Sequence, residues 1–180
     1  MAEDLTNMLR YGLILAALAG AVHSQNVKVD WDRAADFSPY KTYKWTDIPS
    51  PRTPSKEMAQ LIRDVTDVQL GARGLKRIEN GEPDLLVGYS ITLGQPKGQG
   101  AAPAISGTSW QAGSNWSGEL ASDKAQRKGT LNIDIADSKK NLLIWRGTVM
   151  AEVGDSVNDA RIKVSKGIGK AFAKFPPPPK

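Results

Sequence analysis

The stretch LLVGYSITL at residues 85–93 decides the fold that the rest of the sequence predicts. Leu85 and Val87 alternate with Leu86 and Gly88, and the alternation continues to the end of the stretch. A period of two places successive side chains on opposite faces of a β-strand. Because one of the two sets is entirely apolar, this stretch predicts a strand that turns one face to the core.

The same period predicts further strands on both sides of this stretch. They cover residues 27–31, 41–45, 75–78, 131–135 and 142–153. The polar run at 137–141 predicts a hairpin loop between the last two. Trp31, Trp45 and Trp145 fall within these strands, so we expect them in the core.

Two amphipathic helices are predicted where apolar residues recur at spacings of three and four. The first stripe is Met58, Leu61, Ile62, Val65, Val68, Ala72 and Leu75, and the second is Val157, Ala160, Val164, Ile168, Ala171 and Phe175. Thr53 and Pro54 fit the N-cap and first position of the first helix, and Gly74 fits a left-handed C-terminal cap. The second helix is expected to begin near residues 155–156. Gly167 and Gly169 inside it predict a close approach to the sheet.

This order of elements predicts an α+β fold. We expect an antiparallel sheet of about five to six strands with both helices packed on one face. Residues 25–175 would form a single domain, interrupted by a flexible Gly/Ser-rich insertion at about 94–128. Residues 176–180 would form a Pro-rich tail.

The N-terminal segment has the pattern of an export signal. Residues 11–22, YGLILAALAGAV, carry no charge but are shorter than the ~20 apolar residues that span a membrane. They fit the apolar region of a cleavable signal covering residues 1–24, with cleavage after Ser24 and translation starting at Met1 or Met8. A buried N-terminal helix is the alternative. We therefore predict a periplasmic or secreted protein, tethered to a membrane only if the signal is not cleaved.

Composition excludes several kinds of chemistry. The 180 residues include 24 basic and 19 acidic side chains, no Cys and one His, for a net charge of +5. Disulfides, thiolate nucleophiles and His/Cys zinc sites are therefore excluded. Removal of residues 1–24 would leave 156 residues with a net charge of +6, and would take away His23. The exported chain would then have no imidazole for acid–base catalysis.

A set of short motifs in fixed order carries a family resemblance. The motifs are ADFS at 35–38, YKTYKW at 40–45, RGL at 73–75, PDLLV at 83–87, GTL at 129–131, ID at 133–134, LIWRG at 143–147 and KFPP at 174–177. Together they resemble a bacterial envelope family known as domain of unknown function 4136, many members of which are predicted lipoproteins. The resemblance implies the fold and an envelope location, and it implies no catalytic residue. The lipid-accepting Cys of such lipoproteins is absent here.

Two groups of side chains are the predicted partner or ligand contacts. They are Trp110 and Trp116 in the insertion, and Lys163, Lys166, Lys170 and Lys174 near the C-terminus. Tryptophan supplies much contact area, although both rings could instead anchor the insertion on the sheet. The lysines fall within an arc of ~80° on a helix, where they could face an acidic partner or only solvent.

The carboxylates form no recognised catalytic or metal motif. Asp30, Asp32 and Asp36 lack the following Gly and the regular alternation of a calcium loop, because Ala34 interrupts them. Asp30, Asp32, Asp84, Asp134 and Glu152 are available as acid or base groups, but nothing in their spacing pairs them. We predict no metal, no cofactor and no nucleic-acid partner.

The sequence therefore favours an exported, non-enzymatic binding or assembly module whose partner is an envelope protein or polymer. One alternative is a binder of anionic lipid or cell-wall polymer that uses the lysine-bearing helix face. The other is a His-free hydrolase that uses two carboxylates.

Overall fold

The computed structural model describes residues 26–93, 128–152 and 156–177. The elements are β1 (Asn26–Trp31), β2 (Thr42–Trp45), α2 (Lys56–Gly71), β3 (Lys76–Arg77), β4 (Leu85–Leu93), β5 (Lys128–Asp137), β6 (Leu142–Glu152) and α4 (Val157–Phe172). The predicted α+β class is confirmed. The strand predicted from Leu131 begins earlier, at Lys128. The insertion predicted at about 94–128 lies outside the described residues, apart from its last residue. The predicted signal lies outside the described residues. In the ranges described, no helix is long and apolar enough to cross a membrane.

The six strands form one mixed sheet in the order β1-β6-β5-β4-β2-β3. The three pairs β1–β6, β6–β5 and β5–β4 are antiparallel, as predicted. β2 is parallel to both β4 and β3, so the expectation of an antiparallel sheet is wrong at this edge. The reason is the connection: α2 carries the chain from β2 back to the end of the sheet where β2 began. A strand that follows such a helical crossover is parallel to the strand before it.

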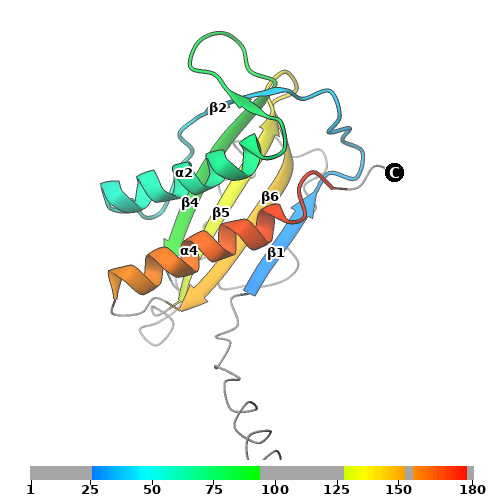
Figure 1. The fold of residues 1–180 in the computed structure, drawn as a ribbon. Helices are drawn as coiled ribbons and strands as arrows, with labels where there is room; N and C mark the ends of the chain where they lie inside the picture. Colours follow the sequence, from blue (N-terminus) through cyan, green and yellow to red (C-terminus); the bar gives the residue numbers. More distant parts are fainter. Residues whose placement is uncertain (1–25, 94–127, 153–155, 178–180) are drawn as a thin grey trace, which may run out of the picture.

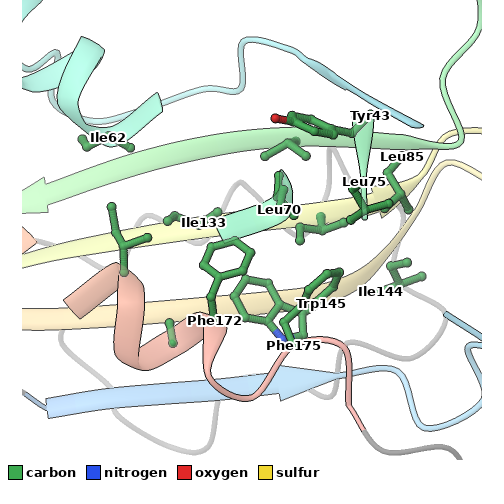
Figure 2. Packing of buried hydrophobic residues seen from close by; sticks show 14 of the residues in the cluster. Tyr43, Ile62, Leu70, Leu75, Leu85, Ile133, Ile144, Trp145, Phe172 and Phe175 are labelled. Atoms are coloured by element: carbon green, nitrogen blue, oxygen red, sulfur yellow. The ribbon is translucent and has the colours of Figure 1, made fainter. Parts of the chain in front are cut away.

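Both helices cover the same face of the sheet, and they begin at the same end of the molecule (Figure 1). The space beneath them is filled by fully buried side chains from both layers, including Ile62, Leu85, Ile133, Trp145 and Phe172 (Figure 2). Each such side chain contributes about 1.5–3 kcal/mol by leaving water. Trp31 and Trp45, expected in the core, are only half-buried at its margin.

The C-terminal end of the core is closed by aromatic rings. The Trp145 ring lies 4.9 Å from that of Phe172 and 5.4 Å from that of Phe175. Phe37 packs edge-on against Phe175 at 5.7 Å. The Arg73 guanidinium donates to the backbone carbonyls of Phe172 and Phe175, which ties the end of α4 to the end of α2.

The helix boundaries correct three details of the prediction. The N-cap of α2 is Ser55, whose Oγ accepts a hydrogen bond from the Met58 amide, and not Thr53. Val68 is 67% exposed, because α2 touches the core along an i, i+4 row that ends at Leu70. Phe175 is buried but lies beyond the end of α4.

The other predicted start and stop signals are confirmed. Ser156 is the N-cap of α4, and Gly74 has a φ of +81° just after α2. Left-handed backbone of this kind favours glycine. The hairpin at 137–141 is present between β5 and β6.

Close approach to the sheet explains one of the two glycines inside α4. A Cβ on Gly167 would lie 2.3 Å from Cγ1 of Val149 in β6, which is well inside van der Waals contact. A Cβ on Gly169 would meet nothing within 4 Å. The predicted contact is therefore confirmed at Gly167 and wrong at Gly169.

We expect Gly167→Ala to destabilise the fold, because the added methyl group must push α4 away from β6. The free energy of unfolding should fall by about 1–3 kcal/mol. The matched control Gly169→Ala should be neutral or stabilising by up to about 1 kcal/mol, because alanine favours a helix more than glycine does. Urea unfolding of both variants measures the difference, and equal stabilities would contradict the close contact.

Hydrogen bonds to the Asp84 side chain join the start of β2 to the start of β4. Its Oδ2 accepts hydrogen bonds from the Lys41 amide, the Thr42 amide and the Thr42 hydroxyl, each at 2.9 Å. In return, the Asp84 amide donates to the Thr42 hydroxyl at 3.0 Å. These bonds, the one from the Lys41 amide first, hold the pKa of Asp84 below its usual value.

A lowered pKa makes this stabilisation pH-dependent. It is present above the unfolded-state pKa of about 3.9 and is lost as pH falls below that value. We expect Asp84→Asn to lower the free energy of unfolding by about 1–2 kcal/mol at pH 7, and by less at pH 3. The control Asp47→Asn changes a side chain that is 97% exposed and should have little effect at either pH. A penalty for Asp84→Asn that is the same at both pH values would contradict the role of the carboxylate.

Candidate functional site

The predicted contact lysines differ in their exposure and in their position relative to α4. Lys163 is half-buried near the start of α4, and its Nζ donates to the Glu152 carbonyl at 3.2 Å. Lys166 and Lys170 are exposed on α4. Lys174 is also exposed, but it follows the end of α4, so the predicted four-lysine helix face contains three lysines. Trp110 and Trp116 lie outside the described residues.

Lys163 stands at the edge of a groove of about 490 Å³ between the first halves of α2 and α4. The floor is the end of the sheet, where Ile91, Leu131 and Val149 lie side by side on three strands. One wall includes Met58 of α2, and the other includes Ala160 of α4. Most of the lining is aliphatic, as is typical of pockets that bind small molecules.

The groove is hollow because small residues occupy the positions that would fill it. Gly129 of β5 lies between Leu93 of β4 and Ala151 of β6 in the last row of the floor. Ala160 on α4 adds only a methyl group to the wall. Val157, which begins α4, is 75% exposed although it lines the groove. An aliphatic side chain open to solvent at such a place is a feature of interaction sites.

The rim of the groove carries both signs of charge. Arg52 and Lys163 supply two cations, and Glu152 supplies one anion. The N-caps Ser55 and Ser156 also line it, so the positive ends of two helix dipoles lie at this rim.

Acidic side chains offset part of this positive potential. Glu57 and Asp159 lie in the first turns of α2 and α4. Hydrogen bonds from the Glu57 amide and the Ser55 side chain hold the pKa of Glu57 below its usual value, with a smaller contribution from Arg161 of α4. Among the described residues that line the groove, the two cations outnumber the one anion.

A comparison with known protein families shows the family to which the chain belongs. A family model described as domain of unknown function (DUF4136) matches residues 27–177. The chain belongs to the DUF4136 family. The resemblance seen in the sequence motifs is thereby confirmed.

Solved structures are similar to this DUF4136 chain at low sequence identity. A PDZ domain protein from Parabacteroides distasonis matches with 16% identity and a TM-score of 0.56, over 96% of this chain and 40% of that one. A PelC dodecamer from Paraburkholderia phytofirmans has 10% identity and a TM-score of 0.45, over 83% and 95% of the two chains. Protein XCC0632 from Xanthomonas campestris, of family DUF330, has 11% identity and a TM-score of 0.35, over 76% and 81%. No curated protein matches the chain.

Most of the motifs that carry the DUF4136 resemblance lie away from the groove, but GTL at 129–131 lines it. Phe37, Tyr40, Arg73, Leu85 and Phe175 line one small hollow of about 40 Å³ at the opposite end of the core. A wider hollow of about 690 Å³ lies beside it, between the loop after Trp31 and Pro176–Pro177. There the carboxylates bind nearby backbone: Asp32 accepts from the Ala34 amide and Asp36 from the Ser38 amide. These motifs therefore organise the fold, whereas the GTL motif also contributes to the groove.

The candidate carboxylates take structural positions. Asp134 is fully buried and forms a two-pronged ion pair with Arg146, at 2.6 and 2.7 Å. Backbone amides that donate to Asp36 and Asp84 lower the pKa of each, whereas a catalytic carboxylic acid needs a raised pKa. Within the described ranges, no three His, Cys, Asp or Glu side chains lie together as metal ligands would.

Of the groove residues, sequence reasoning singled out Lys163 alone as a contact. The lining comes from both helices, three strands and the segment before α2, which no single motif connects. The signal that could have been read is the run of small residues at one end of the predicted elements, at Gly129, Ala151 and Ala160.

We expect the Asp134–Arg146 pair to be structural. Arg146→Met should lower the free energy of unfolding by about 3–5 kcal/mol, because it leaves a buried carboxylate without its partner. Combining it with Asp134→Leu should restore most of that loss, since an apolar pair can replace a buried ion pair. Denaturant unfolding of both variants tests this, and a single variant that loses under 1 kcal/mol would contradict it.

Proposed function

We propose that this DUF4136 protein is an exported cell-envelope protein that acts as a non-enzymatic binding module, and that the groove between α2 and α4 is its binding site. The observation that carries the proposal is the groove itself: about 490 Å³ with an aliphatic lining on the end of a paired sheet. Ligand sites in proteins commonly have volumes of about 300–1,000 Å³ and a mostly apolar lining with a few polar groups.

The rigid floor supports a binding role. The groove residues of β4, β5 and β6 are held in register by continuous antiparallel pairing. A preformed site spares a ligand the entropy of ordering the protein, which improves affinity. A ligand that covers the exposed Val157 side chain at the mouth would remove it from water, and this burial would stabilise the complex.

The proposed location rests on the N-terminal sequence. The uncharged run at 11–22 and the small residues at 19–24 have the pattern of a cleavable export signal. The intact mass of the protein recovered from the periplasm tests this part, and a mass that retains residues 1–24 would contradict cleavage.

The exposed lysines of α4 offer a second binding surface for an anionic envelope polymer. Lys166 and Lys170 lie on the exposed part of the helix, away from the groove lining. Changing both to Glu should abolish co-sedimentation with such a polymer if this surface binds it. Unchanged sedimentation would remove this alternative.

Filling the groove should abolish binding of an apolar probe. We expect the protein to bind one equivalent of the neutral dye N-phenyl-1-naphthylamine with a rise in fluorescence. Ala160→Phe places a ring in the groove and should weaken dye binding by about tenfold or more. The control Ile162→Phe adds a ring on the same helix at a side chain that is 44% exposed and does not line the groove. Equal dye binding by both variants, or no binding by the unaltered protein, would contradict the proposal.

A further inference from the structure

We propose that the ligand of the groove is a free single-chain anionic amphiphile, a long-chain alkyl carboxylate. This inference rests on the proposed function of the groove and adds the chemical class of its ligand. Three observations carry it: the paired backbone of the floor, the aliphatic space above it, and the charge of the rim.

The strands of the groove floor offer a bound peptide no free backbone groups for hydrogen bonding. Ile91, Leu131 and Val149 lie on strands that pair with one another across the sheet. The outer side of β4 is also used at this point, because the Ile91 amide donates to the Ser50 hydroxyl at 2.9 Å and the Ile91 carbonyl accepts from the Arg52 amide at 3.2 Å. An extended peptide in the groove would therefore bury backbone groups without partners. A hydrocarbon chain has no such groups.

The walls suit a flexible hydrocarbon chain. The described lining contains aliphatic side chains and Met58 but no aromatic ring. Methionine adapts to irregular apolar shapes. The 490 Å³ of the groove falls within the range of about 300–1,000 Å³ that ligand pockets commonly have, so the space suits a long alkyl chain.

The rim favours an anionic head group. Lys163 and Arg52 outnumber Glu152 among the lining residues. Lys163 is also held at the mouth by its hydrogen bond to the Glu152 carbonyl. In the part of the chain that the structure describes, the Arg52 guanidinium has no ion pair. A carboxylate at the mouth would thus meet more positive than negative charge among the described lining residues.

Displacement of the neutral dye by compounds of graded length tests the hydrocarbon part. We expect alkyl carboxylates of eight or more carbons to displace the dye. Their affinity should rise about three- to fourfold with each added methylene group. The gain should stop when the chain outgrows the groove. A helical amphipathic peptide that displaces the dye, with no displacement by any alkyl compound, would overturn this inference in favour of a protein partner.

Head-group comparison tests the charge. The carboxylate should bind about three- to tenfold more tightly than the alcohol of the same length. An alkyl trimethylammonium of that length should bind less tightly than the alcohol. Lys163→Gln should reduce the ratio of carboxylate to alcohol affinity, and this ratio cancels any general change in the groove. The control Lys166→Gln, on the exposed side of α4, should keep the full advantage.

The outcomes separate the two proposals. If carboxylate and alcohol bind equally, or if Lys163→Gln leaves their ratio unchanged, the anionic class is overturned while the groove remains a binding site. If the dye itself does not bind, the proposed function fails.

Discussion

The close approach of α4 to β6 is the constraint on which the rest of the structure depends. Gly167 lets the helix rest directly on Val149, and Gly147 leaves room for the Trp145 ring, which lies 2.5 Å from where a Cβ on that glycine would be. This packing of α4 on β6 brings the Phe172 ring against the Trp145 ring and closes the C-terminal end of the core. The first turns of the same helix lie over small residues and cannot close the other end, which leaves the groove.

Much of the fold could be predicted from local patterns, because those patterns reflect local physics. The alternation in β4, the N-cap at Ser156 and the left-handed Gly74 each depend on neighbouring residues only. The direction of β2 could not be predicted in this way, since it depends on where the crossover helix returns the chain. The groove was missed for a related reason: its walls and floor come from segments far apart in the sequence.

Most of the family motifs lie away from the groove, whose floor includes Gly129 and Leu131 of the GTL motif. Phe37, Arg73 and Phe175 close one end through ring contacts and through hydrogen bonds from the guanidinium to backbone carbonyls. The other end is lined by aliphatic residues from three strands and two helices. Membership of the DUF4136 family therefore accounts for the architecture, whereas the identity of a ligand has to be argued from the residues of the groove.

The pairing of β1 with β6 has a consequence for the order of folding. Asn26 pairs with Met150, so β1 cannot find its neighbour until the chain has been made as far as β6. Closing so long a loop is entropically costly, and contacts of this range form late and slowly. β1 therefore remains without its partner strand until β6 has been made. For a chain proposed to cross a membrane, this delay leaves β1 unpaired while it is threaded through.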